Sequence, residues 1–125
     1  MPTLEAVMTT KDVADRLSQL FKEYKWKEAL EELFSQDAVS VEPAHSPGLQ
    51  TVQGLDNIKK KGDQFNETVE EMHGGWVGEP VVGGNYIAVA MGMDVTMKGA
   101  GRINMEEICL YEVKEGKIVK EQFFY

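Results

Sequence analysis

The sequence predicts an α+β protein in which helices come first and cover one face of a curved antiparallel sheet. Apolar residues recur at helical spacing through the first half of the chain. From Thr68 onward, runs rich in β-branched and aromatic residues alternate with glycine-containing turns, which is typical of strands. No linker divides the chain, so we expect one domain over residues 1–125.

Two helices are expected near the N-terminus. The first carries a single apolar stripe, which consists of Val13, Leu17, Leu20, Phe21 and Tyr24. Thr9 stands three residues before Asp12, the spacing of a capping box at a helix start. After a short break near Lys25, a second stripe follows at Trp26, Leu30, Leu33 and Phe34. We expect both helices to share one concave partner surface.

A third helix is expected over residues 55–66, with Leu55, Ile58 and Phe65 facing inward. The lysine run at residues 59–61 fits a solvated helix face better than a binding patch. Before this helix, residues 37–43 alternate in polarity and end at a proline, as a short edge strand does.

The C-terminal segment, residues 105–125, predicts a β-hairpin around a Lys-Glu-Gly turn. A three-residue loop with Gly116 in the left-handed conformation would pair Val113 with Lys117. Earlier in the chain, Gly74-Gly75 interrupts a strand pattern and predicts a bulge that bends the sheet.

Composition excludes several functional classes. The net charge of -8 argues against binding to nucleic acid or to an anionic membrane, because both need clustered Lys and Arg. A single cysteine, Cys109, cannot form an internal disulfide or a multi-cysteine metal site. The chain shows no secretory signal pattern and no run of transmembrane length, so we expect a cytoplasmic protein.

Acidic residues recur within the apolar pattern of the C-terminal hairpin. The three-residue loop would make Glu107 and Glu121 diagonal neighbours on the odd-numbered face, with Glu121 opposite Cys109. If that face lines the interior, burial and mutual repulsion raise the pKa of at least one carboxyl and leave an acid beside a base. The alternative is that the odd face is exposed and that the even face, with Ile108, Leu110, Ile118 and Phe124, forms the core.

Three segments carry a resemblance to a known family: Asp37-Ala38-Val39-Ser40-Val41-Glu42-Pro43, Gly54-Leu55-Asp56-Asn57-Ile58 and Gly116-Lys117-Ile118. With them, the chain resembles the SnoaL-like proteins of the nuclear transport factor 2-like superfamily from Lys11 to Tyr125. The resemblance implies a strongly bent antiparallel sheet that forms a cone closed by three N-terminal helices. The superfamily includes ketosteroid isomerases, polyketide cyclases and many non-catalytic binding domains.

The resemblance to ketosteroid isomerases also implies a catalytic base. Their strand similar to D-A-x-x-x-D-P ends in the carboxylate that abstracts a proton beside a ketone, and here that position is Glu42. Their two oxyanion donors are a helix tyrosine and a strand aspartate, and they are not both matched here. The position of the tyrosine corresponds to a residue near Ser18, and that of the aspartate to a residue near Cys109. Steroid isomerisation itself is therefore not implied.

The candidate catalytic residues are thus Glu42 as the base, with Glu107, Glu121 or His73 as proton donor or orienting partner. His73 is included because a histidine in a pocket titrates near neutral pH, although a half-buried structural histidine is the alternative. The candidate ligand-binding residues are Trp76, Met91, Cys109, Tyr111, Phe123 and Tyr125. We expect no metal and no cofactor.

Two functions remain open from the sequence. One is cofactor-independent acid–base catalysis, of the isomerase, cyclase or dehydratase type, on a small apolar carbonyl or polyketide-like compound. The other is a non-catalytic ligand-binding or dimerisation module of the same fold. The resemblance further implies a homodimer, which would form through the outer face of the sheet.

Overall fold

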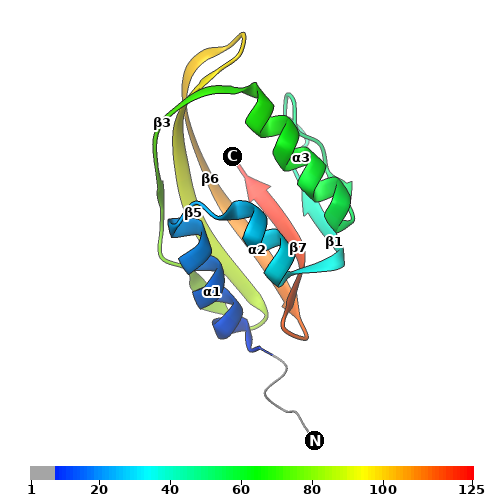
Figure 1. The fold of residues 1–125 in the computed structure, drawn as a ribbon. Helices are drawn as coiled ribbons and strands as arrows, with labels where there is room; N and C mark the ends of the chain where they lie inside the picture. The colour runs from blue at the N-terminus through cyan, green and yellow to red at the C-terminus, as the bar shows by residue number, and fades with distance from the viewer. Residues whose placement is uncertain (1–7) are drawn as a thin grey trace, which may run out of the picture.

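The computed structural model describes residues 8–125 and contains three helices that lie on one side of a curled sheet (Figure 1). The helices are α1 (Thr10–Lys22), α2 (Trp26–Leu33) and α3 (Leu55–Thr68). The predicted capping box is confirmed, because Thr9 and Asp12 exchange side chain-to-backbone hydrogen bonds at the start of α1. In the part of the chain described, no helix is long and apolar enough to cross a membrane.

Seven strands form one mixed sheet within residues 8–125. They are β1 (Phe34–Val41), β2 (Val52–Gln53), β3 (Val69–Val77), β4 (Val81–Gly83), β5 (Tyr86–Met97), β6 (Gly101–Lys114) and β7 (Lys117–Phe124). Their order is β2-β1-β7-β6-β5-β3, with β4 also paired to β5. The predicted bulge in β3 is confirmed by a register shift between Met72 and Gly74.

The position of β1 differs from the prediction of an edge strand. It lies between β2 and β7, and it runs parallel to β7 while the other pairs are antiparallel. The chain leaves β1 and passes through α3 and the β3–β6 meander before β7 returns beside β1 (Figure 1). Pro43 follows β1, so it removes no hydrogen bond from the strand.

The C-terminal hairpin closes through a tighter turn than the sequence predicted. Glu115 and Gly116 both have positive φ, 52° and 77°, as a two-residue type I′ turn requires. Lys114 therefore pairs with Lys117, and the expected pairing of Val113 with Lys117 is wrong.

A bulge in β7 changes which residues after the turn point toward the interior of the fold. Val119 is an extra residue in the register, because the pairing shifts there. As a result Ile118 and Glu121 both point inward, with exposed fractions of 0% and 7%, although one number is even and the other odd. Glu121 lies opposite Tyr111, and the expected pairing with Cys109 is wrong.

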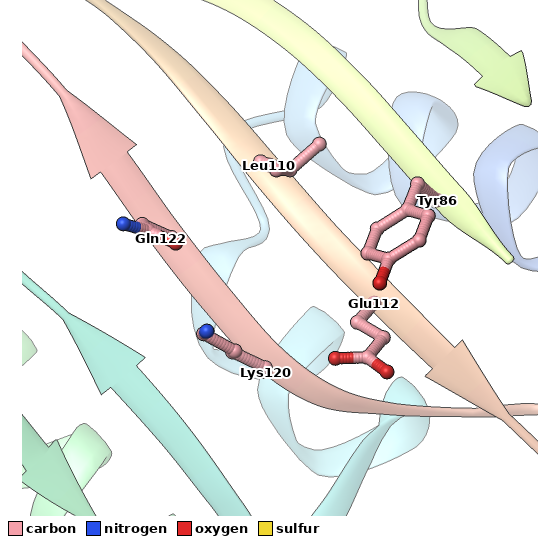
Figure 2. A pocket seen from close by; sticks show the side chains of 5 residues that line it. All are labelled: Tyr86, Leu110, Glu112, Lys120 and Gln122. Atoms are coloured by element: carbon pink, nitrogen blue, oxygen red, sulfur yellow. The ribbon is translucent and has the colours of Figure 1, made fainter.

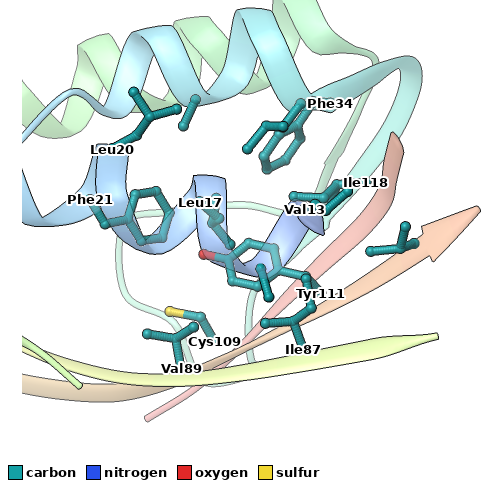
Figure 3. Packing of buried hydrophobic residues seen from close by; sticks show 14 of the residues in the cluster. Val13, Leu17, Leu20, Phe21, Phe34, Ile87, Val89, Cys109, Tyr111 and Ile118 are labelled. Atoms are coloured by element: carbon teal, nitrogen blue, oxygen red, sulfur yellow. The ribbon is translucent and has the colours of Figure 1, made fainter. Parts of the chain in front are cut away.

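The core lies between the helices and the inner face of the sheet. Tyr111 is 1% exposed and packs its ring near Phe21 of α1 and Phe34 of β1, with centroids 6.2 and 6.3 Å away (Figure 3). Odd-numbered β6 residues point into this core, whereas Ile108 on the even face is 51% exposed. The prediction that the odd face of this hairpin is the inner one is therefore confirmed for β6 and for β7 beyond its bulge.

Candidate functional site

Three glutamates, two on strands and one directly after a strand, approach one another inside the fold. Glu42 follows β1 and is 8% exposed, Glu121 of β7 is 7% exposed, and Glu107 of β6 is half-buried. Glu42 points inward because even-numbered residues of β1, such as Ser40, face the interior. Glu107 and Glu121 are not diagonal neighbours as expected, because Glu121 pairs with Tyr111, four residues along β6 from Glu107.

Lys61 of α3 joins these carboxylates and was not predicted. Its ammonium nitrogen lies 2.7 Å from Oε2 of Glu42, and the side chains are 8% and 4% exposed. The assignment of this lysine to a solvated face is wrong, because Leu55, Ile58 and Lys61 are spaced by three residues and are all buried. That spacing is the signal in the sequence that could have identified Lys61 as an inward residue.

Ser40 connects the ion pair to the third carboxyl. Lys61 donates a hydrogen bond to Ser40 Oγ at 2.7 Å, and the Ser40 hydroxyl donates to Glu121 Oε2 at 2.7 Å. Ser40 is fully buried, and its single hydroxyl links Lys61 to Glu121 by two hydrogen bonds. The ring of Phe123 lies beside the ammonium, with its centroid 5.4 Å from Nζ.

Tyr125 covers the ion pair from the solvent side. Its hydroxyl donates to Glu42 Oε1 at 2.7 Å and also lies 2.8 Å from the Ser46 hydroxyl. A ring nitrogen of His45 lies 2.8 Å from the backbone oxygen of Tyr125, which ties the loop after β1 to the end of the chain. Tyr125 is 42% exposed, so this side of the network is accessible to water.

Two of the carboxyls titrate near neutrality. Burial raises the pKa of Glu121 from its ordinary 4.5 to about 7, against the opposing effects of the Ser40 hydrogen bond and the Lys61 charge. Burial, together with the negative charge of Glu42, raises the pKa of Glu107 to about 7. Burial also raises the pKa of Tyr125 to about 12, which keeps its hydroxyl protonated.

The other expected ligand-binding residues on β6 belong to the core. Cys109 is fully buried and Tyr111 nearly so, and both pack with the hydrophobic cluster under α1 (Figure 3). Burial raises the pKa of each group, so Cys109 is held as a thiol and Tyr111 as a phenol. Neither side chain is positioned as an exposed wall of a binding site.

His73 and Trp76 lie apart from the three glutamates, on edge strand β3. His73 is exposed and its Nε2 lies 2.7 Å from the Thr96 hydroxyl of β5. Trp76 is 47% exposed and lies over Gly92, which it faces in the register. Trp76 and Met91 line a hollow of about 20 Å³ that Tyr24 and Trp26 border from the helix side.

A larger hollow lies on the opposite, outer face of the sheet. It measures about 290 Å³ and is lined by Tyr86, Leu110, Glu112, Lys120 and Gln122 (Figure 2). None of the three inward glutamates contributes to either hollow. Tyr125 contacts the Glu42 carboxylate, so a ligand that approaches Glu42 from the side of Tyr125 must displace its ring.

The inner cluster has the groups that proton transfer on a carbonyl compound requires. Glu42 and Lys61 supply a carboxylate and an ammonium in contact, and Glu107 and Glu121 supply carboxyls that are half-protonated near pH 7. An acid and a base of matched strength in one dry site is the usual arrangement for such chemistry.

Comparison with known proteins places the chain in a family. A family model for the SnoaL-like domain matches residues 8–125. A structure from Mesorhizobium loti named as a SnoaL-like polyketide cyclase is similar at 34% identity, with a TM-score of 0.88 over 94% of this chain and 100% of that one.

More distant structures share the fold. An NTF2-like protein from Burkholderia pseudomallei is 20% identical, with a TM-score of 0.74 over 94% of this chain and 92% of that one. A protein from Catenulispora acidiphila with a ketosteroid isomerase-like fold, in complex with trimethylamine, is 16% identical, with a TM-score of 0.70 over 94% of this chain and 87% of that one. No curated protein sequence matches this chain. The chain belongs to the SnoaL-like domain family and has the nuclear transport factor 2-like fold.

Proposed function

We propose that this protein catalyses cofactor-independent proton transfer on a small apolar carbonyl or polyketide-like compound. The observation that supports this function best concerns Glu107, a partly accessible carboxyl beside the buried Glu42–Lys61 ion pair. The pKa of Glu107 is about 7. An acid that is half-protonated at neutral pH transfers protons efficiently in either direction. The family includes cyclases and isomerases, which use chemistry of this kind.

In this proposal each inner residue has a separate role. Glu42 takes a hydrogen from the carbon beside the carbonyl, and protonated Glu107 returns a proton to the carbon skeleton. Glu121 accepts the Ser40 hydrogen bond and thereby holds Lys61 in place. The proposal gives no role to His73, because it lies on edge strand β3 and its partner is Thr96 of β5, away from the three glutamates.

Exchange of α-hydrogens in heavy water tests the reaction without knowledge of the natural product. A panel of small cyclic ketones, β-diketones and aromatic polyketide fragments is incubated with the protein, and deuterium incorporation is followed by NMR. We expect exchange that slows as the pH rises through about 7, because Glu107 then loses the proton that it returns.

Variants identify the carboxyls responsible. Glu42→Gln and Glu107→Gln should each lower the exchange rate by about a hundredfold or more. Glu106→Gln is the matched control, because Glu106 is the exposed neighbour of Glu107 on β6. Equal rates in Glu107→Gln and Glu106→Gln would refute the role of Glu107.

The alternative is a non-catalytic binding module, which one observation favours. The Glu42 carboxylate already accepts hydrogen bonds from Lys61 and Tyr125, and the Glu42 backbone N–H donates to the Thr51 hydroxyl. A network so complete suits a structural or ligand-holding role. Compounds of the same panel that raise the melting temperature without any deuterium exchange would favour this alternative.

We also propose that the protein forms a homodimer through the outer face of the sheet. Ile108 and Phe124 are 51% and 48% exposed there, and they are register partners on adjacent strands. Glu112 and Lys120 face each other nearby, so a two-fold contact would bring opposite charges of two copies together. Sedimentation analysis measures the mass directly, and a monomer at all concentrations tested would contradict this contact.

A further inference from the structure

Lys61 carries a positive charge that is buried and held by two close contacts. Its side chain is 8% exposed, and Nζ lies 2.7 Å from both Glu42 Oε2 and Ser40 Oγ. The ammonium group has three N–H donors, and these two contacts use two of them. The pairing with Glu42 is the contact that balances its charge, since Ser40 is neutral.

A buried ion pair constrains any reaction that neutralises one partner. Removing charge from one member leaves the other uncompensated in a medium of low polarity, which is strongly unfavourable. If Glu42 takes a proton from a substrate carbon, Lys61 loses its negative partner at that moment. The same proton transfer, however, creates a new negative charge on the substrate.

We propose that Lys61 exchanges partners during the reaction, leaving the Glu42 carboxylate and pairing with the enolate oxygen of the substrate. This inference rests on the proposed function, in which Glu42 is the base. The C–H bond breaks and an O–H bond forms on Glu42, while the C–H electron pair becomes the carbon–carbon double bond of the enolate. The carbonyl π electrons move to oxygen, Lys61 keeps its three protons, and the total charge of the site is unchanged.

This exchange narrows the class of substrate. The hydrogen that is removed and the oxygen that becomes negative must reach two side chains that are in contact with each other. A compact ketone or β-diketone, whose α-hydrogen and oxygen are on neighbouring atoms, satisfies that requirement. The ring of Phe123 beside Lys61 would contact the apolar part of such a compound.

Tyr125 occupies the position from which the substrate hydrogen would be taken. Its hydroxyl donates to Glu42 Oε1, the carboxylate oxygen that Lys61 does not hold. The ring is 42% exposed, so it can leave toward solvent without disturbing the core. Entry of the substrate therefore replaces one hydrogen bond to Glu42 by another.

Phenols test the exchange because their anions resemble enolates and are not turned over. The probe is para-nitrophenol, whose absorption distinguishes the phenolate from the phenol, and para-nitroanisole is the analogue that cannot ionise. We expect Glu42→Gln to bind the phenolate more tightly than the unmodified protein by about tenfold or more, because Lys61 then lacks its own carboxylate. Lys61→Met should weaken phenolate binding by about tenfold or more and leave para-nitroanisole unaffected.

The opposite signs of these two effects separate partner exchange from a structural ion pair. A pair that only stabilises the fold would give losses of the same sign in both variants, and that result would overturn the inference. Lys60→Met is the matched control, because Lys60 is the exposed neighbour of Lys61 on α3. If Lys61→Met does not fold, the double variant Glu42→Gln with Lys61→Met removes both charges, and phenolate binding by it would overturn the inference equally.

The outcome also distinguishes this inference from the proposed function. Effects of the same sign in a protein that catalyses α-hydrogen exchange would overturn the partner exchange alone. Effects of opposite sign, without α-hydrogen exchange on any compound of the panel, would overturn the proposed function. The conclusion that Lys61 binds an anionic oxygen of the ligand would still hold.

Discussion

Replacement of Glu121 by glutamine should stabilise the protein at neutral and higher pH. Glutamine has nearly the shape of a protonated glutamate, and its carbonyl oxygen can still accept the Ser40 hydrogen bond. The variant therefore removes the titrating proton while it keeps the packing around a side chain that is 7% exposed.

The magnitude follows from the raised pKa of Glu121. Between about pH 4.5 and about pH 7 the folded protein holds a proton on this residue that the unfolded chain has lost, so the free energy of unfolding falls as the pH rises. A difference of about 2.5 pH units at about 1.4 kcal/mol each corresponds to about 3 to 4 kcal/mol. The advantage of Glu121→Gln should therefore grow from near zero at about pH 4.5 to about 3 to 4 kcal/mol above about pH 7, and then level off.

Chemical denaturation at a series of pH values measures this directly. The control is Glu106→Gln, an equal change on the exposed outer face, which should differ from the unmodified protein by less than about 0.5 kcal/mol throughout. A free energy difference for Glu121→Gln that does not change with pH would refute the reasoning, because it would mean that Glu121 has the same pKa folded and unfolded.

Three further predictions concern other parts of the molecule. Ser40→Ala removes the hydrogen bond that favours ionised Glu121, so the pKa of Glu121 should rise above about 7 in an NMR titration; a lower value would contradict this. A side chain at Gly92 would lie 2.3 Å from the Trp76 indole nitrogen, so Gly92→Ala should push the half-exposed ring into water. Its fluorescence should then shift to the red at a stability cost of about 1 to 3 kcal/mol, whereas unchanged emission would be inconsistent with this packing. Ile108→Asp on the outer face should convert a dimer to monomers in sedimentation experiments, and a dimer that persists would place the contact elsewhere.

Local patterns in the sequence were sufficient for the helices and for the inner face of β6. The spacing of Val13, Leu17 and Leu20 identified the buried side of α1, and Thr9 identified its start. Alternation along β6 predicted that Cys109 points inward, and all of these residues follow rules that act within a few positions of the chain. The family resemblance added the bent sheet and Glu42.

The parts that the sequence did not reveal depend on contacts between distant residues. Lys61 lies on the inward stripe of α3, but its burial is stabilised by Glu42, nineteen residues earlier, which helical spacing does not reveal. The hairpin register depended on Glu115, a residue type that rarely adopts positive φ, sharing the turn with Gly116. The two-residue turn and the bulge at Val119 together place Glu121 opposite Tyr111, farther along β6 from Glu107 than the sequence predicted.

The central claim is that two glutamates inside the fold have proton affinities matched to neutral pH. Site-resolved NMR titration of isotope-labelled glutamate carboxyl groups, assigned with Glu107→Gln and Glu121→Gln, tests it most directly. We predict that the resonances of Glu107 and Glu121 change with midpoints at about pH 7. Midpoints for both residues at 4.5, the ordinary value for a glutamate in water, would contradict the account.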